Sequence, residues 1–239
     1  FCSVFLFLSS LLFSSGSEDG AEIKIQLLNP LPLLLNAGET LTLRFQLENR
    51  QSQPQHLFIN CLLPKGWNLL FKEDEIELQP YEKSFVLSSL YIPKKARAGD
   101  YQIVYLFVDK FSAQEKVRFE LKVDIKPQIK LEWQPIFAPH RAIAGADFTY
   151  CFLLINRSNL PVKVNIQAGG NWPFPLQVRP DSFSLDPEEE KEISIFIKTK
   201  KDLAYKIRYH LLVAAIAQSS NLSPVTLATS SFTEVIPLT

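Results

Sequence analysis

The chain has 239 residues, of which 46% are hydrophobic and 12% aromatic, a composition typical of one large globular domain or two ordinary ones. Its 25 basic and 25 acidic residues give no net charge, which argues against a nucleic-acid-binding protein with a basic, phosphate-neutralising face. Sixteen prolines against eight glycines, placed between short apolar runs, favour a β-sandwich over a helical bundle.

The chain opens on an apolar run, CSVFLFLSSLLF at residues 2–13, followed by small residues and the acidic pair Glu18-Asp19. This order predicts a secretory signal peptide over residues 1–17, cleaved after Gly16 or Ser17. The run is shorter than the roughly 20 apolar residues that a membrane-spanning helix needs. The sequence contains no methionine, even at position 1, so we expect the precursor to begin further upstream. The alternative interpretation is an apolar strand at the edge of a domain.

Removal of the leader would leave two cysteines, Cys61 and Cys151, one in each half of the chain. Neither half could then close a disulfide of its own, so we expect buried free thiols. We also expect a mature protein without a membrane span, exported to the periplasm or the cell surface.

The first half reads as a series of short strands separated by turns. Residues 23–27, 40–49 and 116–125 alternate apolar and polar side chains, as half-buried strands do. Further strands are expected at 56–63, on both sides of the Gln79-Pro80 turn and at 101–108, and Trp67 is expected between the two sheets. Roughly seven or eight strands in about 105 residues predict an immunoglobulin-like antiparallel sandwich over 18–125.

The stretch Ala37–Pro54 returns as Ala144–Pro161, which predicts a second copy of this sandwich over 126–239. We also match Trp172 to Trp67 and the segment 205–209 to 101–105. The residues kept at one offset are Ala37/Ala144, Gly38/Gly145, Phe45/Phe152, Asn49/Asn156, Arg50/Arg157 and Pro54/Pro161. Asn156 also heads a glycosylation sequon, as does Asn221, but its match with Asn49 favours a structural role for Asn156 at a corner.

The two copies differ on the outward face of the central strand. In the first copy these residues are polar, whereas in the second they are apolar and form a candidate interface, since exposed apolar surface marks contacts. The alternative is that loops of the second copy or the neighbouring copy cover them. The residues are Arg44, Gln46 and Glu48 in the first copy, and Cys151, Leu153 and Ile155 in the second.

Catalytic and ligand-binding signatures are not evident. The chain shows no nucleophile elbow, phosphate loop or dinucleotide fingerprint. Its three histidines, His56, His140 and His210, lie far apart, and the acidic run at 188–190 fits a solvated turn. We therefore predict a protein without catalytic residues, cofactor or metal site.

The order of motifs resembles the NEW3-type immunoglobulin-like domains of secreted and cell-envelope proteins in bacteria and archaea. The resemblance covers both copies, although Asn171 replaces the glycine before Trp172, and Ala204 precedes Tyr205. It implies a spacer or adhesive module attached to surface proteins. The matching residues are Gly38, Asn49, Pro64, Gly66, Trp67, Leu78, Pro80, Gly99 and Tyr101.

The chain is also similar, more weakly, to periplasmic pilus chaperones, which consist of two immunoglobulin-like domains. This resemblance implies that the last strand of the first copy offers Val117, Phe119, Leu121 and Val123 to a partner by strand addition.

From these features we expect an exported, non-enzymatic tandem protein that acts as a structural or protein-binding module of a cell envelope. The alternatives are a chaperone-like, subunit-binding protein that uses strand addition, and an accessory region of a larger secreted enzyme. In each case a protein partner is expected, either another protein or further domains of the same chain.

Overall fold

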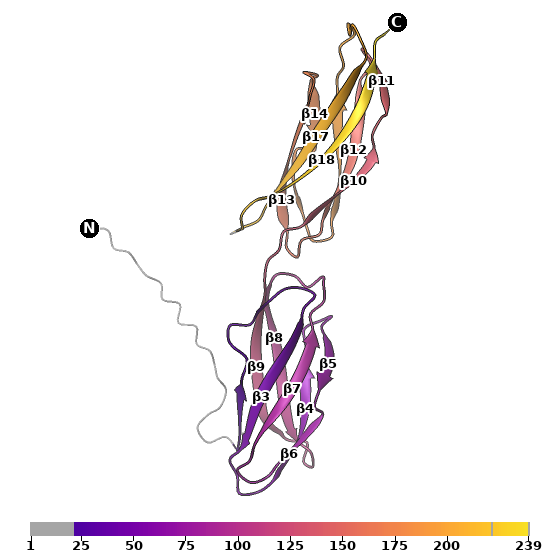
Figure 1. Ribbon diagram of the computed structural model, residues 1–239. Coiled ribbons are helices and arrows are strands. Elements are labelled where there is room, and N and C mark those ends of the chain that lie inside the picture. The colour runs from indigo at the N-terminus through magenta and orange to yellow at the C-terminus, as the bar shows by residue number, and fades with distance from the viewer. Residues whose placement is uncertain (1–21, 221, 239) are drawn as a thin grey trace, which may run out of the picture. The chain divides into compact units, whose positions relative to one another are not determined.

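A computed structural model of the chain describes residues 22–220 and 222–238. Eighteen strands and no helix occur in this described part, so the predicted all-β class is confirmed. The predicted signal peptide lies outside the described residues. The chain divides into two compact units, the first running to Lys94 and continuing over Asp100–Ile125, the second comprising Lys95–Gly99 and the chain from Lys126 onward (Figure 1).

The first unit is a sandwich of two sheets. Most strand pairs are antiparallel, and the parallel exception joins β2 to the end of β9. One sheet has the order β1-β3-β7-β5, with β1 at Ile23–Leu27, β3 at Thr40–Asn49, β7 at Lys83–Tyr91 and β5 at Asn68–Lys72. The other has the order β2-β9-β8-β4-β6, with β2 at Leu34–Leu35, β9 at Glu115–Ile125, β8 at Gly99–Asp109, β4 at Gln55–Leu62 and β6 at Glu75–Leu78.

The second unit repeats this strand order, which defines an immunoglobulin-like sandwich in each unit. Its first sheet has the order β10-β12-β16-β14, with β10 at Leu131–Phe137, β12 at Phe148–Asn156, β16 at Glu190–Ile197 and β14 at Leu176–Arg179. Its second sheet has the order β11-β18-β17-β13-β15, with β11 at Arg141–Ile143, β18 at Val225–Ile236, β17 at Ile207–Gln218, β13 at Val162–Gly170 and β15 at Ser182–Leu185.

Alternation of side chains builds the core of each unit. On β3 the apolar residues Leu43, Phe45 and Leu47 are fully buried, while the alternating residues Thr42 and Arg44 are exposed. A turn precedes this strand in both units, and Gly38 and Gly145 adopt positive φ there, at 88° and 84°. Only glycine takes up this backbone conformation without strain, which explains why both copies keep it.

The tertiary structure corrects the match between the two copies at the aromatic residues. Trp67 is 6% exposed and packs on Tyr101 with ring centroids 5.2 Å apart. In the second unit Phe174, 5% exposed, stacks on Tyr209 at 5.5 Å. Strand pairing gives the same alignment of the two units. Leu57 pairs with Asp109 in the first unit, and the equivalent residue Val164 pairs with Ala217 in the second.

Phe174 and Tyr209 are therefore the counterparts of Trp67 and Tyr101, and the match of Trp172 and residues 205–209 is wrong. A Tyr-x-Ile-x-Tyr spacing in both copies suggested the wrong register, because the two tyrosines lie four residues apart. On a strand such a shift keeps the inward face, so side-chain alternation cannot reveal it.

Asn49 and Asn156 form equivalent buried corners, which confirms the structural interpretation of Asn156. Both side chains are 0% exposed. The Asn156 Nδ2 donates to the carbonyl oxygens of Leu185 and Leu160, at 3.0 and 3.2 Å, and its Oδ1 accepts from the Ser158 amide at 2.9 Å. The amide nitrogen and oxygen of the Asn156 side chain are thus both hydrogen-bonded inside the fold.

Both cysteines are free and half-buried rather than fully buried. Burial raises the pKa of the Cys61 thiol, partly offset by a hydrogen bond with Tyr105. Such a thiol is protonated at neutral pH and is unreactive by this criterion.

Candidate interaction surfaces

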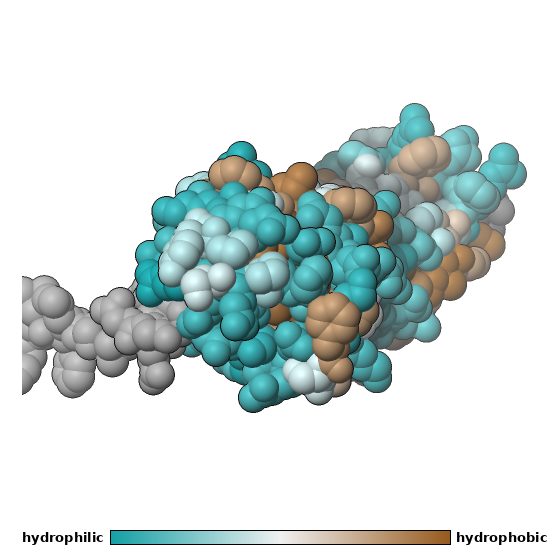
Figure 2. Space-filling model, turned by 90° about the horizontal axis from the view of Figure 1, so that it is seen from below, coloured by the Kyte–Doolittle hydropathy of each residue, from teal (hydrophilic) through white to brown (hydrophobic). Residues whose placement is uncertain are grey.

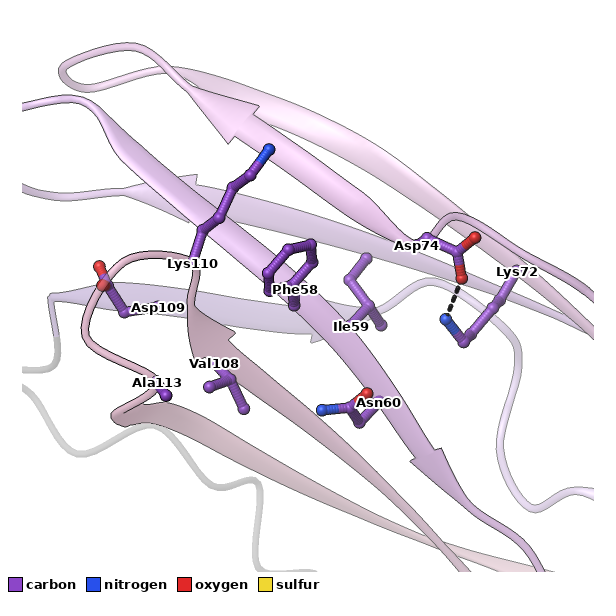
Figure 3. Close-up of a pocket in the computed structure, with 9 residues that line it drawn as sticks. All are labelled: Phe58, Ile59, Asn60, Lys72, Asp74, Val108, Asp109, Lys110 and Ala113. Carbon is purple, nitrogen blue, oxygen red and sulfur yellow. Dashed lines mark hydrogen bonds and ion pairs between the residues drawn. The ribbon is translucent and has the colours of Figure 1, made fainter.

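The first unit has a surface pocket of about 370 Å³ beside β4 and the β8–β9 hairpin (Figure 3). Its two lysines are paired, because Lys72 is directed at Asp74 (2.5 Å) and Lys110 binds Glu75 (2.5 Å). Asp109 accepts hydrogen bonds from Ser112 and from the Phe111 amide, which lower its pKa. The charged groups of this pocket therefore serve the local fold.

Chemistry-bearing side chains do not converge elsewhere in the described chain. No group of three or more potential metal ligands occurs in it. The Glu188 carboxylate of the acidic run binds Lys95 at 3.0 Å and Arg157 at 3.1 Å, and these cations lower its pKa.

The outward face of β12 carries part of the predicted apolar surface of the second unit. Cys151 and Leu153 are half-buried and point outward, as expected. Ile155 is 1% exposed, so its assignment to an exposed face is wrong. It lies in register between Glu132 and Glu190, and Arg157 two residues further on binds Glu132 at 2.8 Å, so charged residues flank this end of the strand.

Neighbouring strands enlarge this surface with residues that sequence reasoning missed. Phe137 pairs opposite Cys151 and is 54% exposed, and Phe196 pairs opposite Thr149 and is 42% exposed. A bulge between Pro135 and Phe137 breaks the alternation of β10, which hid this contribution in the sequence. We call the set the β10–β12 patch: Ile136, Phe137, Cys151, Leu153 and Phe196.

The equivalent sheet of the first unit is not uniformly polar, contrary to expectation. Arg44, Gln46 and Glu48 lie on the outward face of β3 as predicted. Strands β7 and β5 add apolar side chains to this sheet, and β5 was not predicted as a strand. We call them the β5–β7 patch: Leu70 (58% exposed), Phe71 (52%), Phe85 (60%) and Leu87 (40%).

The end of the first unit that carries the β6–β7 turn has a different character. Figure 2 views this end and shows mostly hydrophilic residues, with apolar residues in small separate groups. The β5–β7 patch, by contrast, lies on a sheet face of this unit.

The four residues proposed for strand addition face the core of their own unit. Phe119 packs edge-on against Phe45 with centroids 5.5 Å apart. Leu121 is 4% and Val123 1% exposed, so these two are core residues and not an exposed surface. Val117 and Phe119 are half-buried. Strand β9 buries only one of its two faces, so the alternation in its sequence indicates a strand. The alternation does not indicate what covers the apolar face.

Comparison with known proteins adds little beyond the fold. No known protein family and no curated protein matches the chain. Among solved structures, a FixG-related protein from Vibrio parahaemolyticus shares 16% identity with a TM-score of 0.37, over 44% of this chain and 97% of that one. A protein of unknown function from Porphyromonas gingivalis W83 shares 13% identity, with a TM-score of 0.33, over 89% and 99%.

Native alpha-2-macroglobulin from Escherichia coli, from domain MG7 to the C-terminus, shares 12% identity with a TM-score of 0.39, over 61% of this chain and 23% of that one.

The class of the protein, a tandem immunoglobulin-like β-sandwich, follows from the strand order of the two units. The described part contains no helix with the length and hydrophobicity to cross a membrane.

Proposed function

We propose that the chain is an exported, non-enzymatic tandem immunoglobulin-like protein that serves as a structural and protein-binding module of a cell envelope. The observation that carries this proposal is the β10–β12 patch. Phe137 and Phe196 are about half-exposed on the same sheet as Leu153. Exposed aromatic residues grouped on one face favour a protein contact, because they bury large apolar area at low entropic cost.

The mode of binding follows from the edge strand. Pro135 and the adjacent bulge interrupt the pairing capacity of β10, so a partner would pack on side chains and not add a strand. The resemblance to NEW3-type domains supports the same role, as a spacer or adhesive module.

Export is supported by the apolar run at 2–13 and the small residues that follow it. A mature N-terminus at Ser17 or Glu18 in a periplasmic or surface fraction is the expected result. A chain that keeps residues 1–17 in the cytoplasm would contradict export.

A photo-crosslinking residue at Leu153, introduced in the source cells, tests the binding face. We expect one discrete protein adduct, and we expect Phe137→Lys in the same chain to suppress it, because a charge in the patch opposes burial. The matched control is the same probe at Asn165, an exposed position on β13 in the other sheet. Equal adducts at both positions, or none at Leu153, would sink the proposal.

Strand addition along β9 is a second candidate function, favoured by a separate observation. Strand β9 has eleven residues, and β2 pairs with the last two of them, Asp124 and Ile125. The rest of β9 precedes this pair along the same edge of the strand. Val117 and Phe119 are half-exposed along the preceding part. An extended segment could pair with this edge and cover both side chains.

A further inference from the structure

The open edge of β9 has a defined length within the described chain. Strand β8 borders one side of β9, and β2 borders the other side only at Asp124 and Ile125, which leaves residues 115–123 of that edge without a neighbouring strand. The Asp124 amide donates to the Leu33 carbonyl at 2.9 Å on this edge. By the two-residue period, the amides and carbonyls of the even-numbered residues 116–122 point the same way, as a template for another strand.

Strand β2 limits how a second copy of β9 can fit against this edge. Two antiparallel copies are related by a two-fold axis, which passes through the residue that faces its own copy. With the axis at Phe119, residues 115–123 of one copy face residues 123–115 of the other, and each β2 lies just beyond the start of the second β9. An axis at an earlier residue shortens the overlap, and an axis at a later residue brings β2 against the second strand.

This register also brings opposite charges together. Arg118 comes one residue before the axis and Glu120 one residue after it, so Arg118 of each copy faces Glu120 of the other. Both side chains are exposed and form an ion pair of 2.7 Å within one copy, so the dimer groups four charges of alternating sign. At the two ends Lys116 faces Lys122, but Glu22 lies 3.0 Å from Lys116 and balances its charge.

The apolar face of β9 gains cover in the same register. The two Phe119 residues face each other at the axis, and Val117 faces Leu121 of the second copy. The amides of these odd-numbered residues point toward β8, so they form the non-hydrogen-bonded pairs, whose side chains lie closest together. Val117 and Phe119 are half-buried in one copy, and the second copy would cover their remaining surface.

We propose that two copies of this chain pair through β9, antiparallel about an axis at Phe119, and join their two sheets into one continuous sheet. This proposal rests on the strand addition along β9 proposed above, and it names a second copy of the chain as the strand that is added. It is independent of the β10–β12 patch and of whatever partner that patch binds.

The second unit does not offer this complementarity. Strand β11 meets β18 at Glu234 as β2 meets β9 at Asp124, so the counterparts of the two charged residues are Ala228 and Ser230. Neither carries a charge, and pairing of two β18 edges would lack the alternating cluster. Self-association is thus a property of the first unit.

Sedimentation velocity of residues 18–239 over a concentration series tests the proposal. The wild-type chain should show a monomer–dimer equilibrium, and Glu120→Pro should weaken it at least tenfold, because each copy loses an outward amide that bonds across the axis. The matched control, Ser230→Pro at the equivalent edge position of β18, should leave the equilibrium unchanged. A wild-type chain that is monomeric throughout, or equal effects of the two variants, would overturn the proposal.

Failure of self-pairing is distinguishable from failure of strand addition. A photo-probe at Val117 that captures a different protein in the source cells, from a chain that is monomeric when purified, would overturn the dimer. Strand addition along β9 would stand in that case.

A charge exchange tests the register. Arg118→Glu and Glu120→Arg should each weaken the dimer several-fold, because each places like charges opposite one another twice. The double variant should regain wild-type dimerisation, since the pairs are restored with reversed sign. Both side chains are exposed, so thermal melting should show all variants folded, and a double variant as weak as the single ones would contradict the axis at Phe119.

Discussion

Single buried polar residues account for the sharpest similarity between the two units. Asn49 Nδ2 donates to the carbonyl oxygens of Gln53 and Leu78, at 2.8 and 3.4 Å, and its Oδ1 accepts from the Gln51 amide. Asn156 makes the equivalent bonds in the second unit. A side chain that both donates and accepts at one point is required there, and asparagine meets that need.

Asn156→Ala should lower the free energy of unfolding of the second unit by about 3 kcal/mol, because buried carbonyl and amide groups lose their partner. Urea denaturation followed by Trp fluorescence measures this change. The control is Asn165→Ala, at an exposed position on β13, which should change the stability by less than about 0.5 kcal/mol. Equal effects of the two substitutions would show that the corner is not a main source of stability.

Buried tyrosines differ in how their hydroxyl groups are satisfied. Tyr105 donates to Ser88 at 2.7 Å, and Tyr150 and Thr233 share a hydrogen bond of 2.6 Å. The Tyr209 hydroxyl is buried and has no hydrogen-bond partner in the described chain. Burial raises the pKa of all three side chains. These groups should therefore govern stability at alkaline pH.

Tyr150 provides a test, because burial raises its pKa from 10.0 to about 12. Below pH 10 both folded and unfolded chains hold the proton, so its contribution to stability is fully present. Between pH 10 and 12 the unfolded chain ionises first, and the free energy of unfolding should fall by about 1.4 kcal/mol per pH unit from this residue.

Tyr150→Phe should be less stable at pH 8, where it lacks the bond to Thr233, and should lose stability less steeply above pH 10. Denaturation curves from pH 8 to 12 measure both effects. Tyr105 contributes equally to both proteins, so the difference between the two profiles reports on Tyr150 and on its electrostatic coupling to Tyr209. Parallel stability profiles would contradict the assignment.

At the level of strands, the exposed edges of β10, β5 and β9 differ in how readily they could pair with another chain. Strand β10 carries Pro135 and a bulge, which discourage pairing with another chain. Strand β5 has five residues and a register shift between Leu69 and Phe71. Strand β9 is long and regular, and its outward side chains are charged, including Arg118, Glu120 and Lys122. Of these three edges, β9 offers the longest unbroken template for strand addition.

Lys122→Pro tests strand addition without altering the core. The Asp124 amide donates to the Leu33 carbonyl at 2.9 Å on the outer edge, so by the two-residue period the Lys122 amide also faces that edge. An added strand needs that amide, whereas β8 does not. Crosslinking from a photo-probe at Val117 in the source cells should be lost in Lys122→Pro and kept in Lys122→Ala. Adducts that persist in the proline variant would argue against strand addition.

At the level of the whole chain, two units share one strand order but differ on their outer surfaces. Core positions keep their character, as with Phe45 and Phe152, which are 0% and 1% exposed. Surface positions do not, since Phe85 and Leu87 of the first unit correspond to Glu192 and Ser194 of the second. Packing constrains the core of each copy, and solvent leaves the outward residues free to acquire separate contacts.

The sequence by itself determined the all-β class, the two-fold repetition of the sandwich and the structural role of the Asn49 and Asn156 corners. These features rest on local alternation and on residues whose chemistry suits one position. Only the tertiary structure decided the register of the aromatic residues, the burial of Ile155, Leu121 and Val123, and the exposure of the β5–β7 patch. The reason is that a strand's alternation tells which residues share a face, but neighbouring strands, distant in sequence, determine what covers that face.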